Sequence, residues 1–213
     1  MLELYEEYLE AIEDDAVKEG LGDLRLAREE FHNLTGKYED GEPWFELRMM
    51  MFLDWYLLDR PGPDGRTPVE CYLDIHAGEL EPAEKRQLEY LCSTMRSTFE
   101  ILATKGTELR LLDLLRGGEW RVHCTMTTVG LSKGDILGAR IVFFDGKPSI
   151  GRGIVLHPRE AHEVIKSIVA RAQKEHLPLG QLCNHLDKMR LKLDRYSNVR
   201  ISHIYRYPSD VLF

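Results

Sequence analysis

The chain has 213 residues, of which 43% are hydrophobic and 30% charged, and its formal net charge is −8. This length corresponds to one or two domains, and it is long enough to bury a core of its own. Only 17 glycines and nine prolines are present, which excludes collagen-like and low-complexity chains. No apolar stretch approaches the roughly 20 residues that cross a bilayer, so we expect no membrane partner.

The charge is unevenly distributed along the chain. Residues 1–60 carry −11, residues 61–150 carry −2 and residues 151–213 carry +5. An acidic beginning and a basic end can attract each other, within one chain or between two copies. The alternative interpretation is that both are solvated helix faces. The overall acidity argues against binding of duplex DNA, although the basic end leaves a local nucleic-acid contact open.

Short motifs exclude several chemistries. The four cysteines (Cys71, Cys92, Cys124 and Cys183) lie far apart and form no CxxC pair, which argues against a zinc or dithiol redox site. HExxH, GxSxG, GxxxxGK[ST] and GxGxxG are all absent. The acidic start, MLELYEEYLE, is unlike a signal peptide. We therefore expect free thiols, a cytoplasmic location, and neither metal nor cofactor.

The first 97 residues have the apolar spacing of helices. Helix starts are expected near the N-terminus (residues 1–20), after Asp23, at Pro43, at Thr67–Pro68 and at Glu81–Pro82. The Pro43 helix, WFELRMMMFLDWYLLDR, is apolar on two sides and should be central to the fold. Thr67 and Glu70 have the spacing of a capping box.

From residue 98 onward the apolar residues alternate with polar ones, as in strands. Five strands are expected, at residues 99–103, 109–115, 120–127, 136–145 and 149–156, joined by glycine-containing turns. No helix fits between them, so the sheet should be antiparallel. Gly138, inside the fourth strand, favours a small barrel, whereas Gly151-Arg152-Gly153 should let the fifth strand bend.

After Pro158 the spacing of apolar residues is helical again, with a break at residues 177–180. The final segment, SHIYRYPSDVLF, is expected either to add an edge strand or to dock in a groove. The segregation of elements predicts an α+β fold. It comprises a helical domain (1–97), a five-stranded antiparallel β barrel of the SH3 or OB kind (98–156), and two C-terminal helices with the apolar tail (157–213).

Three stretches carry a family resemblance. FLDWYLLDRPGPDGRTPVECYL (52–73), LLDLLRGGEWRV (111–122) and LSKGDILGARIVFFDGKP (131–148) resemble a helix-plus-barrel region of uncharacterised bacterial proteins. Many of those proteins end in a SEC-C zinc motif. The resemblance spans roughly residues 44–165 and implies the fold, whereas the family has no assigned activity. The SEC-C motif is missing from this chain, so its zinc does not carry over.

One candidate site is the end of the apolar helix and the loop after it. Asp54, Asp59, Arg60, Asp64 and Arg66 cluster there in the sequence. They indicate either a polar site whose arginines hold an anionic ligand or a salt-bridged anchor for the proline-rich loop. The second interpretation is favoured, because exposed ion pairs of this kind are common.

A second candidate site lies on the barrel. Trp120, Arg121, Arg140, Phe143 and Phe144 supply the aromatic and cationic side chains that bind single-stranded nucleic acid. Phe143 and Phe144 point to opposite faces of their strand, so one of them should lie outside the barrel. The favoured alternative is that this second aromatic ring packs beneath a helix.

These observations favour a non-catalytic cytoplasmic adaptor that binds a protein partner, either a different protein or a second copy of itself as a homodimer. The alternative is single-stranded nucleic-acid (RNA) binding through the barrel. The third hypothesis is an enzyme with a site near the Asp54–Arg66 loop.

Overall fold

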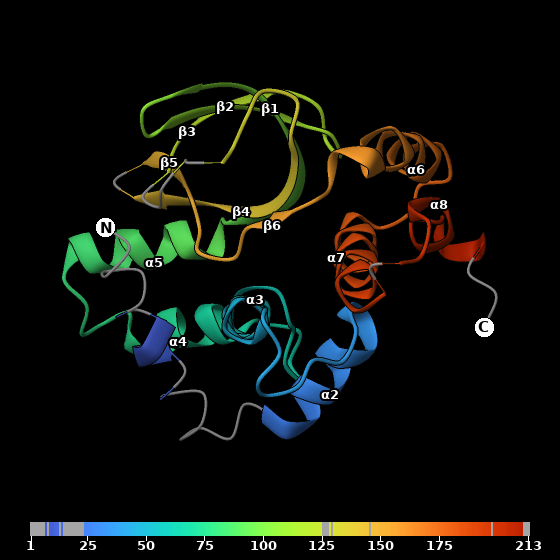
Figure 1. Cartoon of the computed structure of the whole chain (residues 1–213). Helices are drawn as coiled ribbons and strands as arrows, with labels where there is room; N and C mark the ends of the chain where they lie inside the picture. Colours follow the sequence, from blue (N-terminus) through green and yellow to red (C-terminus); the bar gives the residue numbers. More distant parts are fainter. Residues whose placement is uncertain are drawn as a thin grey trace.

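The computed structural model describes residues 24–124, 128, 130–144, 146–196 and 198–210, together with the helical residues 7, 9–12 and 14. A curved sheet lies over α3, α4 and α5, while α6, α7 and α8 flank it (Figure 1). The expected mixture of helices and strands is confirmed. Most of the helix expected over residues 1–20, and Asp23, lie outside the described residues.

The helices before the sheet begin close to their expected starts. They are α2 (Leu24–Thr35), α3 (Phe45–Leu58), α4 (Pro68–His76) and α5 (Pro82–Cys92). The capping box of Thr67 and Glu70 is confirmed, and α5 has a similar box. Helix α3 begins two residues after Pro43, because the Phe45 N–H donates to the Glu42 carbonyl and closes a turn first.

The sheet has six strands: β1 (Met95–Lys105), β2 (Glu108–Asp113), β3 (Glu119–His123), β4 (Ile136–Phe144), β5 (Lys147–Ile150) and β6 (Val155–Leu156). Five of them pair in the ring β1-β2-β3-β5-β4, which the β4–β1 pairing closes. Strand β6 lies outside this ring, on β4.

The prediction of a five-stranded, purely antiparallel sheet is wrong. Strands β3 and β5 are parallel, paired through His123 and Ser149. The reason is geometrical: a ring with an odd number of strands cannot alternate in direction all the way round. The expected fifth strand is split into β5 and β6, because the Gly151 N–H donates to the Arg140 carbonyl and the chain then leaves the ring.

Strand β4 is buried on both faces. Leu137, Ala139 and Ile141 join the core inside the ring, whereas Val142 and Phe144 pack outward against the core of the N-terminal helices. A two-sided strand of this kind is central to its fold. The outer face of β4 is therefore an interior surface, which matters for every polar residue on it.

The C-terminal helices are α6 (His162–Lys174) and α7 (Leu179–Arg195), and two further turns follow in α8 (Ile201–Ile204) and η2 (Pro208–Asp210). The short η1 (Arg159–Ala161) leads into α6. Tyr205 and Tyr207 are buried in the same core as α6 and α7. The described part of the final segment thus docks on the helices and adds no strand.

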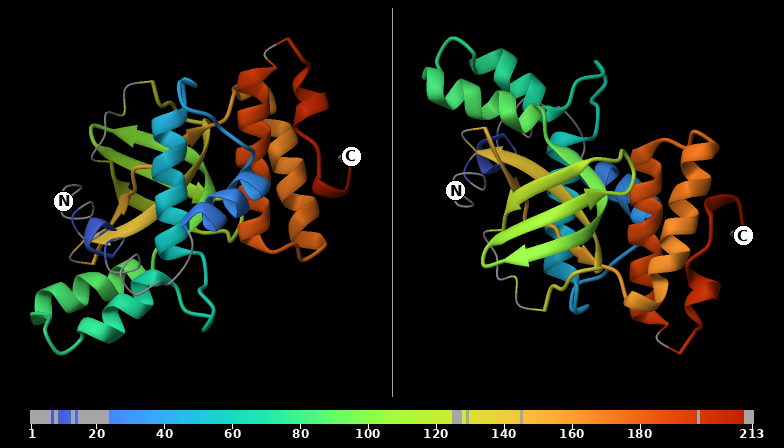
Figure 2. Two further views of the ribbon diagram at one scale, coloured as in Figure 1. Left: turned by 90° about the horizontal axis from the view of Figure 1, so that it is seen from below. Right: turned by 90° about the horizontal axis from the view of Figure 1, so that it is seen from above.

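Helix α7 lies against the acidic beginning of the chain, alongside α2 (Figure 2). Arg195 forms an ion pair with Glu42 at 2.7 Å, and the Lys188 ammonium donates to the Asn33 carbonyl. Part of the attraction between the acidic and basic ends is therefore satisfied within one chain. Among the described residues no helix is long and apolar enough to cross a membrane.

Candidate ligand-binding site

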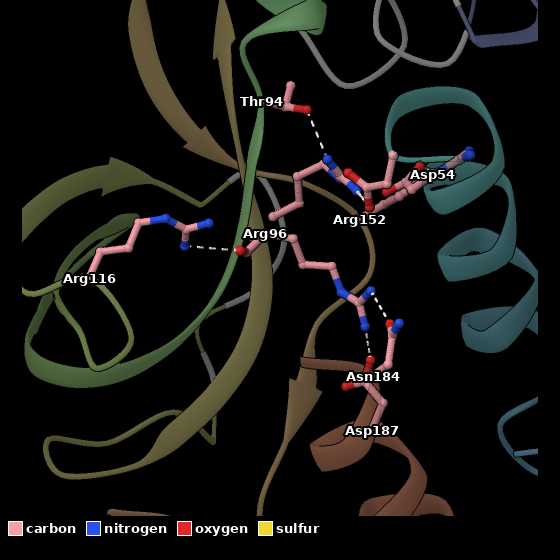
Figure 3. A network of polar contacts seen from close by, with 9 residues as sticks. Asp54, Thr94, Arg96, Arg116, Arg152, Asn184 and Asp187 are labelled. Atoms are coloured by element: carbon pink, nitrogen blue, oxygen red, sulfur yellow. Dashed lines mark hydrogen bonds and ion pairs between the residues drawn. The ribbon is translucent and has the colours of Figure 1, made fainter. Parts of the chain in front are cut away.

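A network of arginines and aspartates fills the junction between the ring, α3 and α7 (Figure 3). Its side chains come from parts of the sequence that are far apart, and most are shielded from water. The cations are Arg48, Arg96, Arg140 and Arg152, and the carboxylates are Asp54, Asp59 and Asp187. Buried charges require partners, so the geometry of this network is tightly determined.

Arg96 is the link between β1 and α7. Its guanidinium donates to Asn184 Oδ1 at 2.8 Å and to the carboxylate of Asp187. The side chain of Asp187 is only 5% exposed. Burial, the largest single influence, acts against the charge on Arg96, but the negative groups around it, Asp187 first and then Cys183 and Asp59, together raise the pKa of the guanidinium. Arg96 is thus a fixed cation at the junction.

Two further arginines connect the ring with α3. Arg140, on the outer face of β4, donates to Thr94 Oγ1 at 2.9 Å and forms an ion pair with Asp59. Arg152 donates to Asp54 at 3.2 Å. The turn Gly151–Gly153 carries Arg152 toward α3, which explains why the chain leaves the ring at this point.

Arg48 gives the network one more cation than carboxylates. It is 3% exposed and donates to the Thr35 carbonyl at 2.6 Å rather than to an acidic side chain. Burial lowers its pKa, and no neighbouring charge offsets this fully. The junction therefore has a surplus of positive charge, which favours an anion nearby.

A pocket of about 410 Å³ lies beside this network. Its polar lining is Asp59, Thr94, Arg96, Arg116 and Asn184, and its apolar lining is Trp55, Leu58, Met95, Gly180 and Cys183. A pocket at the junction of several segments, with an apolar part and several converging polar groups, has the general character of a small-molecule site. A much smaller pocket, of about 20 Å³, is lined by Arg96, Arg140 and Asp187 among others.

Helix α7 begins at the edge of this pocket. No side chain caps its N-terminus and its first turn holds no acidic residue. A Cβ at Gly180 would meet nothing within 4 Å, so the backbone there is open to approach. The partial positive charge of the helix end adds to that of Arg96 and Arg116.

The Asp54–Arg66 cluster is divided between two roles. Asp54 and Asp59 belong to the buried network. Arg60 instead pairs with Glu30 at 2.7 Å, and Arg66 pairs with Asp64 and Asp74 in the exposed loop. The structure thus brings Asp59 to the 410 Å³ pocket and Asp54 to the small one, whereas Arg60 and Arg66 hold the loop in place.

The five candidate residues on the barrel do not share one exposed face. Trp120 and Phe143 lie with the core inside the ring, their centroids 6.2 Å apart in a T-shaped contact. Phe144 points out of the ring and packs in the core of the N-terminal helices. This agrees with the favoured expectation that one of the two aromatic rings packs beneath a helix. Arg140 is 3% exposed in the network, and Arg121 is exposed opposite Arg110 on β2.

Several residues of the site were not singled out from the sequence: Thr94, Arg96, Arg116, Cys183, Asn184 and Asp187. One signal for them exists. Cys183, Asp187 and Leu191 recur at intervals of four and form a second buried stripe on α7. A carboxylate on such a stripe requires a buried cation, but which residue supplies that cation depends on tertiary structure.

The pocket shows no nucleophile or metal site among the residues described. Burial raises the pKa of the Cys183 thiol to about 11, so the thiol stays protonated and is a poor nucleophile near neutral pH. No cluster of three or more His, Cys, Asp or Glu side chains that could hold a metal ion occurs in the described part of the chain. The lining groups can bind and orient a ligand through hydrogen bonds and charge.

Comparisons with known proteins gave no match. No family model matches the chain, and neither a curated protein nor a solved structure matches it. The resemblance to the helix-plus-barrel region of SEC-C-bearing proteins stays a prediction.

Proposed function

We propose that the protein is a non-catalytic binding protein for a small anionic ligand, held in the pocket between α3, β1 and the start of α7. The observation that carries this proposal is the lining of one 410 Å³ pocket by Arg96, Arg116 and Asn184 beside a network with surplus positive charge. Arginine is the side chain best suited to phosphate and carboxylate groups.

The hydrogen-bonding state of these residues supports binding. The Asn184 carbonyl oxygen already accepts from Arg96, which leaves its amide N–H₂ to donate. Thr94 Oγ1 accepts from Arg140, so its hydroxyl hydrogen can point elsewhere. Arg116 donates through Nη1 to the Arg96 carbonyl at 3.2 Å, and the same nitrogen forms an ion pair with Asp113 at 3.6 Å, so its other nitrogens remain as donors. The pocket is therefore rich in donors, as an anion requires.

Isothermal titration calorimetry tests the proposal with three probes: inorganic phosphate, phenyl phosphate and benzoate. At least one should bind with a stoichiometry of one. Arg116→Gln should weaken that binding about ten- to hundredfold, because a charge-assisted hydrogen bond contributes about 1.5–3 kcal/mol. Arg110→Gln is the matched control, since Arg110 is an exposed arginine on β2 that does not line the pocket.

The control variant should bind as the unmodified protein does. If Arg110→Gln weakens binding as much as Arg116→Gln does, the probe is attracted by the overall charge of the protein. That result would count against binding in the pocket. Absence of binding by all three probes would also overturn the proposal.

The adaptor and nucleic-acid hypotheses stay predictions, and the structure weakens the reasons for both. Two features that favoured a protein partner were the opposite charges of the chain ends and the aromatic final segment. Part of the charge is paired within the chain, between Glu42 and Arg195, and Tyr205 and Tyr207 of the final segment are buried. Trp120 and Phe143 are half-buried against the ring core and contact each other, so neither ring is a fully exposed surface for stacking bases. For these reasons we favour the pocket, and a small ligand, over either macromolecule.

We also propose a cytoplasmic location for this activity. All four cysteines are free, and three of them are buried. Free thiols are typical of reducing compartments, whereas exported proteins tend to pair them. The SH3-like or OB-like assignment of the ring and the enzyme hypothesis for the Asp54–Arg66 loop stay predictions as well.

A further inference from the structure

The residues that line the pocket indicate the chemical class of its ligand as well as the sign of the ligand's charge. We propose, resting on the function proposed above, that the ligand is a phosphate monoester of an apolar, preferably flat, group and not a carboxylate. Four features of the pocket carry this inference: the spread of its donors, the charge of its cations, the chemistry of its apolar lining and the position of its one carboxylate.

The donors of the pocket come from separate elements. Arg96 is on β1, Arg116 is in the turn after β2, and Asn184 is on the first turns of α7. A carboxylate is planar and is satisfied by the fork of a single arginine. A phosphoryl group presents three terminal oxygens in different directions, so donors on three elements suit it better.

The cations of the site also match a doubly charged group. Arg96 keeps its charge because Asp187 and the other negative groups around it raise its pKa against the effect of burial, and Arg116 adds a second guanidinium to the lining. The uncapped end of α7 adds a further partial charge. A phosphate monoester carries about −1.5 to −2 charges at pH 7, whereas a carboxylate carries one.

Part of the pocket lining is apolar. Trp55, Leu58 and Met95 contribute to it, and Trp55 is 8% exposed. The indole ring is held by Phe31, whose centroid lies 5.3 Å away. A fixed aromatic surface of this kind favours a flat or apolar group, because the contact requires no reordering of the side chain.

Asp59 determines which way round such a ligand lies. Its carboxylate lines the pocket, 31% exposed, on the side of α3. It repels an anion and accepts hydrogen bonds from donors. The phosphoryl group therefore binds toward Arg96, Arg116 and Asn184, and any hydroxyl or amino group of the ligand lies toward Asp59.

The experiment compares phenyl phosphate, benzoate and inorganic phosphate by calorimetry at one pH and ionic strength. Phenyl phosphate should bind at least about tenfold more tightly than benzoate, since it adds one or more charge-assisted hydrogen bonds. It should also exceed inorganic phosphate by about tenfold, through burial of its ring. Its binding should alter tryptophan fluorescence, because Trp55 lines the pocket.

The outcomes separate this inference from the function on which it rests. Benzoate binding as tightly as phenyl phosphate, and lost in Arg116→Gln, would overturn the phosphate class and leave the anion-binding function standing. Inorganic phosphate binding as tightly as phenyl phosphate would overturn the apolar half of the inference. Failure of every probe would overturn both proposals together.

Discussion

Single residues in the junction contribute unequally to stability. Asp187 is the sole carboxylate joined to Arg96 by an ion pair among the described residues, and it is 5% exposed. Removing one member of a buried pair leaves the other charge without compensation and costs about 3–5 kcal/mol. Asp187→Asn keeps the size of the side chain, so it isolates the charge. Urea denaturation should show a loss of free energy of unfolding in that range.

The exposed pair Arg25–Glu29 provides the comparison. Its side chains are 74% and 58% exposed, and Glu29→Gln should cost only about 0.3–0.5 kcal/mol. A loss for Asp187→Asn no larger than that for Glu29→Gln would show that water screens the Arg96–Asp187 pair, and it would contradict the description of that pair as largely buried.

A second residue predicts a dependence on pH. His157 is 2% exposed, and burial lowers its pKa from 6.5 to about 3, with Arg190 acting in the same direction. Below pH 6.5 the unfolded chain therefore takes up a proton that the folded chain refuses. This group lowers the free energy of unfolding by up to about 1.4 kcal/mol per pH unit as the pH falls from 6.5 toward 3.

His157→Phe removes that titration. The stability of the variant, measured by denaturation at several pH values, should fall less steeply between pH 6 and 4 than that of the unmodified protein. Equal slopes would mean that His157 is protonated in the folded state and would contradict its burial.

Residue-scale prediction from sequence reached Asp54, Asp59 and Arg140 but not the pairs that they form. Asp59 meets Arg140 across 81 positions, and Asp54 meets Arg152 across 98. Charge type and local spacing identify a residue that needs a partner. Which partner it meets is decided by the pairing of β1 with β4 and the packing of α3, and neither leaves a local signal.

At the scale of elements, local sequence signals predicted individual helices and strands well, but they did not predict how the strands close into a ring. The capping box at Thr67 and the alternation of β2 depend on neighbours in the sequence, so they could be predicted directly. The parallel contact of β3 with β5 arises only when five strands close a ring. The position of strand β6 depends on the direction that the chain takes at Gly151–Gly153. The periodicity of the sequence does not predict that direction.

The packing of α2 on α7 depends on one glycine. Gly36 ends α2 with φ +94°, and a Cβ there would lie 2.9 Å from Leu191 Cδ2 on α7. Gly41 has a similar φ of +85° but nothing within 4 Å. Each alanine substitution costs about 1–2 kcal/mol for the left-handed backbone.

Gly36→Ala should cost about 1 kcal/mol or more beyond Gly41→Ala, because it also overpacks the contact with Leu191. Thermal denaturation of the two variants measures the difference. Equal losses would indicate that α2 and α7 separate freely at this point, against the close packing described for them.

At the scale of the whole molecule, the network joins the three segments that the sequence divides into domains. Arg96 connects the ring with α7, and Arg140 and Arg152 connect it with α3. The pocket exists only where all three segments meet, so neither the ring nor the helices alone could have indicated it. The sequence predicted the classes of element, and their junction supplies the candidate site.

The most direct test of the central claim is a crystal structure of the protein grown with phenyl phosphate, or with benzoate if that binds more tightly. We expect the anionic group in the pocket, in contact with Arg96 and Arg116 and near the start of α7. An empty pocket at a saturating concentration would contradict the account. So would a ligand bound elsewhere, for example in the groove of Arg121 and Lys147 between β3 and β5.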